Sequence, residues 1–338
     1  MSVFTARNFV LANGAVLPVL EIAYELYGEM ADDRSNVILV AHGISSSHHA
    51  AGPPTLDRRR GWYAEIIGPG KLLDTDRYCI VSSNTLGSCY GSTGPASANP
   101  LTGDRYGLSF PEICYEDIVR AQHLLLVSLR VTRLAAVVGS SIGGYQTFQW
   151  AVTFPEFMSA VLALDTAPKD PFDATSIAAR LAETFSSDPH WNGGNYRTGS
   201  MVEALTTYRV EMLRSYGFEE KLGDVNTATR QSILSRAAHE WAVEFDPLSL
   251  IALFRAGGTF NVESDLAKIA APLMYVLCDT DEWFPASLGK AVMVKLQDAG
   301  VDARFLLIHS DLGHYATTEE PQKWVPQAQA FLRKAAFS

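Results

Sequence analysis

The chain has 338 residues, of which 47% are hydrophobic, and 37 acidic against 27 basic residues give it a formal net charge of −10. This length and apolar content fit one α/β domain with a large core and an insertion. The acidic balance, with no basic run longer than Arg58 to Arg60, argues against nucleic acid as a partner.

The first residues and the cysteines predict a cytoplasmic protein without metal or cofactor. No uninterrupted apolar segment precedes Arg7 and Asn8, so we expect no secretory signal, and no stretch is long enough to span a membrane. The four cysteines lie far apart, without CxxC spacing, which argues against a zinc site and against a disulfide framework. We expect them to be reduced and mostly buried.

The strand pattern begins with a hairpin and continues as a parallel sheet. Residues 9–12 and 20–26 flank Asn13 and Gly14, a pair typical of antiparallel hairpin turns. Short apolar runs typical of strands buried on both faces then follow at 36–41, 78–83, 134–139, 160–165, 273–278 and 303–308. The segments between several of them predict crossover helices at 116–129, 142–153 and 286–299, and a last helix at 322–335.

The strand pattern stops between Pro168 and Gly258, where helical patterns take over. We expect residues 1–167 and 259–338 to form the α/β core and residues 168–258 to form a helical lid. A lid inserted late in an open sheet would cover the carboxyl ends of the strands, where ligands bind in such sheets.

The sequence GSSIG at 139–143 is a G-x-S-x-G motif between a predicted strand and a predicted helix. This context is typical of a nucleophile elbow, in which the central serine, here Ser141, occupies a strained turn and the glycines permit a close strand–helix approach. A phosphate-binding helix start or a plain turn would also explain the motif alone. Partner residues elsewhere in the chain therefore decide between these interpretations.

Candidate partners follow Ser141 in the order acid, then histidine, which is the order found in α/β-hydrolase folds. His314 follows the last predicted strand and is the candidate base, because a serine hydroxyl needs a base within hydrogen-bond reach. After the preceding strand the chain offers Asp279, Asp281 and Glu282 as the acid, and spacing alone does not choose among them.

Attack on a carbonyl carbon also requires two N–H donors for the oxyanion. We expect one from the backbone of Ile142, at the start of the helix after the serine, and one from Ile44, in the loop after the first parallel strand. The nearby His48 and His49 lack a third ligand at metal spacing. We expect a structural or pocket-lining role for them.

Several long segments of the chain carry distinctive motifs. They are AHGISSSHHAAG at 41–52, the segment 61–107, FPEICYEDIVRAQHLLL at 110–126 and VVGSSIGGYQTFQW at 137–150, with shorter ones at 278–285 and 311–314. Together these segments resemble the homoserine O-acetyltransferase family of α/β-hydrolase-fold proteins. The resemblance implies a mostly parallel sheet flanked by helices, with Ser141 as nucleophile, Asp281 as acid and His314 as base. It supports Ile44 and Ile142 as oxyanion donors. It also implies a tunnel to the serine, dimerisation through the lid and ping-pong acetyl transfer from acetyl-CoA.

Two positions bear on the acceptor of the acyl group. The family has a lid arginine that helps to hold the homoserine carboxylate; Arg209 matches it, unless it lies on the surface of its helix. The family also has an aspartate, directly after the histidine, that pairs with the homoserine ammonium, and here this residue is Tyr315. Homoserine would then lack this partner for its ammonium, and loss of a hydrogen bond to a charged group costs about 1.5–3 kcal/mol of binding free energy. Homoserine is therefore a doubtful acceptor. With Tyr145 and Trp283, Tyr315 predicts an aromatic pocket, unless these rings pack in the core.

We therefore favour a serine carboxylic ester hydrolase, of carboxylesterase or acetylesterase type, that acts on small acetyl or short acyl esters through an acyl-serine intermediate. The alternative is a homoserine O-acetyltransferase, or a related acyl-CoA-dependent O-acyltransferase, with the same triad. Retention of all three triad residues disfavours a non-catalytic binding module. The expected partners are a small ester and a second copy of the chain, and neither nucleic acid nor a membrane.

Overall fold

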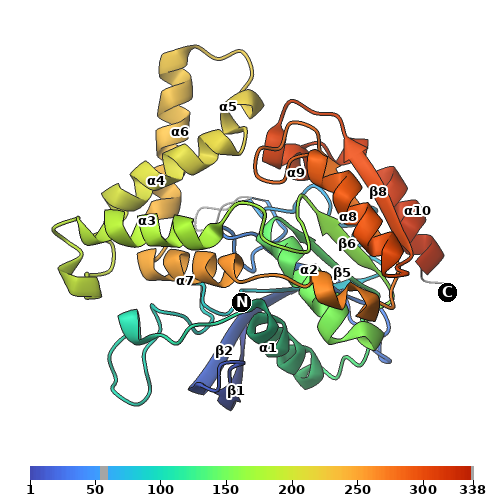
Figure 1. The fold of residues 1–338 in the computed structure, drawn as a ribbon, viewed down its shortest axis with the longest axis horizontal. Coiled ribbons are helices and arrows are strands. Elements are labelled where there is room, and N and C mark those ends of the chain that lie inside the picture. The colour runs from blue at the N-terminus through green and yellow to red at the C-terminus, as the bar shows by residue number, and fades with distance from the viewer. Residues whose placement is uncertain (54–59, 336–338) are drawn as a thin grey trace.

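The computed structural model describes residues 1–53 and 60–335, which form one mixed sheet with helices on both of its faces (Figure 1). The sheet has the strand order β1-β2-β4-β3-β5-β6-β7-β8. Its strands are β1 (Ser2–Val10), β2 (Val16–Tyr27), β3 (Val37–Ala41), β4 (Cys79–Ser83), β5 (Ala136–Ser140), β6 (Val161–Leu164), β7 (Leu273–Cys278) and β8 (Ala303–Ile308). β2 pairs antiparallel with β1 and β4, and all other neighbouring strands are parallel. The carboxyl ends of β3 to β8 therefore meet at one edge of the sheet.

Each of the six predicted apolar runs overlaps one of the strands β3 to β8, which confirms the expected α/β fold. The opening hairpin is longer than predicted and starts at Ser2, because β1 is largely exposed and lacks the continuous apolar run on which the prediction depended. The last strand, β8, is also not buried on both faces, since it forms the edge of the sheet and exposes Phe305.

The helices of the α/β core bury apolar residues against both faces of the sheet. They are α1 (Tyr115–Ser128), α2 (Ile142–Thr153), α8 (Ser287–Asp298), the short α9 (Ala316–Glu319) and α10 (Val325–Ala335). Leu39 and Val137 face one hydrophobic cluster, which includes Trp150 of α2. Ile38, next to Leu39 on β3, faces the other cluster, which includes Trp324. The last helix begins later than predicted, because a 3₁₀ turn occupies 321–323.

Residues 168–258, called the helical segment below, lie between β6 and β7 and contribute no strand to the sheet. They form α3 (Ala174–Ser186), α4 (Val202–Ser215), α5 (Phe218–Lys221), α6 (Thr227–Ala242) and α7 (Pro247–Gly258). These helices gather on one side of the molecule, and α5 and the nearby part of α6 project farthest from the sheet (Figure 1). The indole N–H of Trp241, in α6, donates to the carbonyl of Ser45, in the loop after β3, at 3.0 Å. This hydrogen bond joins the helical segment to the edge where the parallel strands end.

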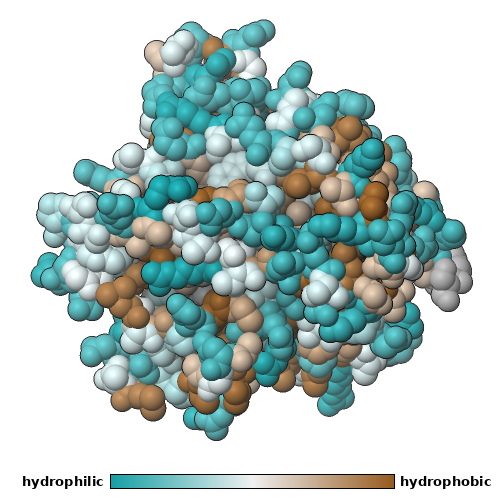
Figure 2. Space-filling model, in the orientation of Figure 1, coloured by the Kyte–Doolittle hydropathy of each residue, from teal (hydrophilic) through white to brown (hydrophobic). Residues whose placement is uncertain are grey.

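The surface in Figure 2 is mostly hydrophilic, with hydrophobic residues in small separate groups. Within the described ranges, no helix combines the length and the apolar character needed to cross a bilayer. All four cysteines are free thiols; Cys79 and Cys278 are buried, whereas Cys89 and Cys114 are partly exposed.

Candidate active site

Ser141 occupies the turn between β5 and α2 with a left-handed φ of 60° and a ψ of −130°. Residues other than glycine rarely adopt a positive φ, and strain of this kind clusters at functional sites. The strand and the helix approach closely here. A Cβ atom added at Gly139 would lie 2.2 Å from the carbonyl oxygen of Gly143, and one added at Gly143 would lie 2.2 Å from that of Ala41. Both glycines of the motif are therefore needed for this turn.

His314 and Asp281 meet in the loops after β8 and β7. The Nδ1 atom of His314 lies 2.7 Å from Oδ2 of Asp281. The other carboxylate oxygen accepts hydrogen bonds from the backbone N–H groups of Trp283 and Phe284, at 2.8 and 3.2 Å. These contacts fix the carboxylate and, through it, the imidazole. Nε2 is then the nitrogen left for a nucleophile.

The opposite charges of His314 and Asp281 stabilise each other. Burial alone would lower the pKa of His314, but the charge of Asp281 and its hydrogen bond outweigh burial and raise that pKa above 6.5. Burial would raise the pKa of Asp281, but the charge and hydrogen bond of His314 and the two backbone amides outweigh it, so this pKa is lowered. Asp281 is therefore ionised at neutral pH and stabilises an imidazolium at position 314.

The structure separates the three candidate acids. Asp279 pairs with Nδ1 of His309 at 2.8 Å, and the side chain of His309 is 79% exposed. Glu282 is exposed to solvent. Only Asp281 contacts His314, so only this acid is placed to orient the candidate base.

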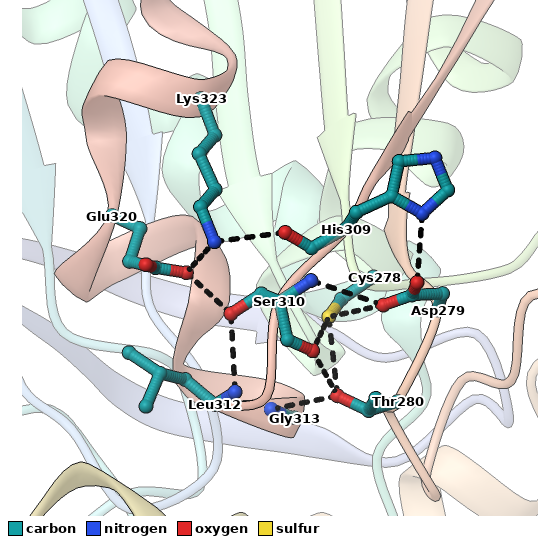
Figure 3. A network of polar contacts seen from close by, with 9 residues as sticks. All are labelled: Cys278, Asp279, Thr280, His309, Ser310, Leu312, Gly313, Glu320 and Lys323. Carbon is teal, nitrogen blue, oxygen red and sulfur yellow. Dashed lines mark hydrogen bonds and ion pairs between the residues drawn. The ribbon is translucent and has the colours of Figure 1, made fainter.

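A polar network ties the loop that carries the acid to the turn that carries the base (Figure 3). The hydroxyl of Thr280 donates to the carbonyl of Ser310 at 2.6 Å and accepts from the backbone N–H of Gly313 at 3.1 Å. The hydroxyl of Ser310 in turn donates to Glu320, which pairs with Lys323 at 2.6 Å. The two loops therefore hold each other in place.

Ser141 and His314 line one cavity of about 380 Å³, called the serine cavity below. Its walls come from loops at the carboxyl ends of the strands and from α4, α5 and α6. Ile44 also lines it, and a Cβ atom added at Gly43 would lie 3.7 Å from Cβ of Ser141. The backbone N–H groups of Ile44 and Ile142 have no hydrogen-bond partner within the described ranges. Both donors are therefore available to an oxyanion.

Tyr145 and Trp283 do not line the serine cavity, which corrects the prediction for these two residues. Tyr145 is fully buried, and its hydroxyl donates to Asp170 at 3.0 Å. The indole N–H of Trp283 donates to the hydroxyl of Ser215 at 3.0 Å. Tyr145 packs in the core and the partly buried Trp283 packs against it, because proximity in the sequence does not determine which way a side chain points.

Arg209, in α4, does line the serine cavity. Its guanidinium carbon lies 5.0 Å from the ring centroid of Trp241 and 5.9 Å from that of Tyr216. Nη1 donates to the thioether sulfur of Met212, a weak acceptor, and the buried Nε has no hydrogen-bond partner in the described part of the chain. This cation therefore lies near two aromatic rings, and no carboxylate in the described part of the chain pairs with it.

Tyr315 also lines the serine cavity and packs against Tyr216 and Phe218, with ring centroids 6.1 and 6.0 Å apart. The ammonium of Lys221 lies 5.2 Å from the Tyr315 ring and pairs with Glu319 at 2.5 Å. An aromatic ring and a paired lysine therefore occupy this part of the cavity.

The histidines after β3 do not line the serine cavity. His49 contacts the carboxylate of Glu25 at 3.0 Å, and His48 lies 4.0 Å from the same group. The hydroxyl of Tyr27 also donates to Glu25, at 2.6 Å. Of the two roles expected for the histidines, the structure therefore favours the structural one.

Sequence reasoning missed Tyr216 and Asp165. The ring of Tyr216 lies 4.8 Å from the imidazole of His314. Asp165 directly follows β6 and offers an oxygen atom that lies, with one oxygen of Asp281 and one ring nitrogen of His314, in a group whose atoms are within 4.8 Å of one another. The signal for Asp165 was present, because it ends the apolar run AVLALD at the edge where the parallel strands end.

Residues 36–245 match the protein family described as alpha/beta hydrolase fold. The chain is therefore an α/β-hydrolase-fold protein, in agreement with its sheet and its strained elbow. It is 36% identical to a homoserine O-acetyltransferase of Geotalea uraniireducens, over 96% of this chain and 94% of that protein. It is 35% identical to the same enzyme of Geobacter sulfurreducens, over 98% and 96%. The protein belongs to the homoserine O-acetyltransferase family, which confirms the resemblance seen in the sequence motifs.

Two solved structures are similar to almost the whole chain. Esterase E22 has a TM-score of 0.88 and 28% identity, over 98% of this chain and 99% of that chain. The homoserine O-acetyltransferase of Bacillus anthracis has a TM-score of 0.88 and 27% identity, over 98% and 96%. The fold thus accommodates both activities that the sequence predicted. The sequence relatives support the acyltransferase, our alternative, better than the esterase that we favoured.

Proposed function

We propose that this protein is an O-acyltransferase in which Ser141 carries an acyl group from a thioester, such as acetyl-CoA, to the hydroxyl of an acceptor. The likeness to homoserine O-acetyltransferases over nearly the full chain supports transfer over hydrolysis. The observation that carries the proposal is Arg209, whose guanidinium lines the same cavity as Ser141 and His314 and whose buried Nε has no hydrogen-bond partner among the described residues. A guanidinium in this place matches a carboxylate on the acceptor.

In the first half-reaction, Nε2 of His314 takes the hydroxyl proton of Ser141 while the serine oxygen attacks the thioester carbonyl. The N–H groups of Ile44 and Ile142 hold the resulting oxyanion. Collapse breaks the carbon–sulfur bond, and the proton on His314 passes to the departing thiolate. Asp281 keeps the imidazole oriented and stabilises its positive charge.

In the second half-reaction, the acceptor hydroxyl gives its proton to His314 and attacks the acyl-serine. The bond to the oxygen of Ser141 breaks, and this oxygen takes the proton back from His314. Arg209 would hold the carboxylate of the acceptor so that its hydroxyl lies next to the ester. The entropy lost on bringing the two reactants together is then offset by binding free energy and does not add to the barrier of the chemical step.

A second candidate is hydrolysis of short acyl esters, with water in the place of the acceptor. Tyr315 favours it, because the ammonium of homoserine would meet an aromatic ring and the ammonium of Lys221. The acids that line the cavity, Glu65 and Glu319, are both paired with basic side chains. Hydrolysis therefore becomes the main activity if no acceptor competes with water.

Acetyl-CoA consumption separates the two candidates when it is measured with homoserine, with 4-hydroxybutyrate and with no acceptor. The proposal expects faster release of coenzyme A when an acceptor is added, with the O-acetyl product detected by mass spectrometry. Free acetate as the sole product under all three conditions would favour the hydrolase. Both candidates fail if Ser141→Ala matches the unchanged protein in every assay.

A further inference from the structure

A second buried carboxyl group, that of Asp165, lies beside the pair formed by Asp281 and His314. Its oxygen, an oxygen of Asp281 and a ring nitrogen of His314 lie within 4.8 Å of one another. The backbone carbonyl of Asp165 also accepts a hydrogen bond from the N–H of Ser141 at 3.1 Å. Asp165 therefore adjoins all three residues of the proposed triad, although the mechanism above does not use it.

The conformation and surroundings of Asp165 are unfavourable for stability. Its φ is 41°, in the left-handed region, and its side chain is fully buried. Thr317 donates to Oδ2, whereas Oδ1 has no hydrogen-bond partner among the residues that the structure describes. A strained backbone and a buried polar atom without a partner each destabilise a fold by about 1–3 kcal/mol. Strained residues of this kind cluster at active sites.

The charge near Asp165 depends on few groups. The titratable side chains that face it are the phenols of Tyr63 and Tyr275, the thiol of Cys278, the carboxyl of Asp281 and the imidazole of His314. Burial raises the pKa of both phenols and of the thiol, so these three groups stay neutral at moderate pH. Burial and then the charge of Asp281 raise the pKa of Asp165 from 3.8 to about 8, against the opposing effects of His314, Thr317 and the backbone N–H of Cys278.

We infer that Asp165 is a second acid of this site, a positioning residue that, once it has lost its proton, stabilises the imidazolium of His314 together with Asp281. At neutral pH Asp165 is a neutral carboxylic acid, and Asp281 alone carries the charge. At higher pH two carboxylates adjoin the ring, and transfer of the Ser141 proton to His314 becomes more favourable. The inference rests on the proposed chemistry of Ser141 but not on the identity of the acceptor.

The test follows the reaction of Ser141 with diethyl p-nitrophenyl phosphate, measured as the mass of the labelled full chain between pH 5.5 and 9.5. This probe needs no knowledge of the acceptor. The unchanged protein should react faster in two steps as pH rises, first as His314 loses its proton and then near pH 8 as Asp165 does. Because the two groups interact, the apparent pKa values of the two steps belong to the pair and not to either residue alone.

Asp165→Asn should keep the first step and lose the second. The ratio of the rate of the unchanged protein to that of the variant should increase about tenfold between pH 6.5 and pH 9.5, the effect of about one pKa unit on the basicity of His314. Thr317→Val removes the donor to Asp165 and should move the second step to higher pH. A purely structural role for Asp165 would lower the rate at every pH and would not respond to Thr317→Val.

Asp281→Asn supplies an independent measurement. Its residual rate should rise with the ionisation of Asp165, and the double variant with Asp165→Asn should lose that rise. Thermal unfolding establishes that each variant is folded. The inference is overturned if Asp165→Asn keeps both steps, or if the unchanged protein shows only one. Absence of any label on Ser141 at any pH would overturn the proposed function itself, and the two failures are thus distinct.

Discussion

Nδ1 of His314 lies 2.7 Å from Oδ2 of Asp281, with the two side chains only 7% and 0% exposed. Removal of water from two opposite charges is unfavourable, and here the close contact and the backbone donors to Asp281 offset it. A pair of this kind depends on both members. Loss of one partner leaves the other as a buried charge without its opposite charge, so substitution of either residue should have a large effect.

Asp281→Asn should lower kcat/KM for acetyl transfer by about 10³- to 10⁴-fold, because the imidazole loses both its orientation and the stabilisation of its charge. The acidic limb of the pH–rate profile should also move to lower pH, since Asp281 raises the pKa of His314. Asp279→Asn is the matched control, because Asp279 pairs with the exposed His309. Equal losses in the two variants would contradict our choice of acid.

That choice marks the limit of what residue spacing could predict, since only the family resemblance pointed to Asp281. Apolar runs located strands β3 to β8, because buried strands need continuous hydrophobic residues. The glycines around Ser141 revealed the elbow, since only they permit so close an approach. The acids after β7, however, follow one another within a single loop. The direction of each side chain there depends on backbone hydrogen bonds to Trp283 and Phe284, which spacing does not reveal.

The pocket was harder to predict for the same reason. Tyr145 lies close to Ser141 in the sequence but belongs to the buried face of α2, where it packs against Phe260 with ring centroids 4.3 Å apart. Asp165 escaped notice because its role depends on the strand order, in which β6 lies between β5 and β7. A sequence pattern shows that a residue ends a strand, but it does not show which strands are neighbours.

Arg209→Met should raise the KM of an acceptor with a carboxylate by about 10- to 100-fold, because the variant loses a charge-assisted hydrogen bond worth about 1.5–3 kcal/mol. Acylation by p-nitrophenyl acetate, which has no carboxylate, should change by less than about twofold if Arg209 acts only on the acceptor. Arg209→Lys keeps the charge and should recover part of the loss. A uniform fall with both substrates would point to altered packing against Trp241 instead.

Tyr315→Asp should increase the preference for homoserine over 4-hydroxybutyrate, two acceptors that differ by one amino group. The new carboxylate would pair with the ammonium of homoserine, and the ratio of kcat/KM values should rise by about 10-fold or more. Tyr315→Phe is the control, because it keeps the ring and adds no charge. An unchanged ratio in Tyr315→Asp would show that this part of the cavity does not contact the amino group.

Asp165→Asn should stabilise the fold at pH 8 and have little effect below pH 4. The pKa of Asp165 is about 8 in the folded chain, against 3.8 as its ordinary value, so the folded state binds the additional proton. A group whose pKa is raised by folding contributes stability that is complete below the unfolded value and is lost as pH rises through the folded value. The free energy of unfolding of the unchanged protein should therefore fall relative to the variant between pH 4 and 8, by about 1.4 kcal/mol for each pKa unit.

Urea unfolding at pH 4, 6, 8 and 9 measures this difference directly. The gap between Asp165→Asn and the unchanged protein should widen up to about pH 8 and then level off. Asp279→Asn should show no such widening, because the pKa of Asp279 is lowered and its contribution to stability is lost toward acidic pH. A constant gap for Asp165→Asn would mean that Asp165 binds no additional proton in the folded chain. If this difference in unfolding free energy widens with pH, and Asp165→Asn also loses the second kinetic step, both effects are assigned to the carboxyl group of Asp165.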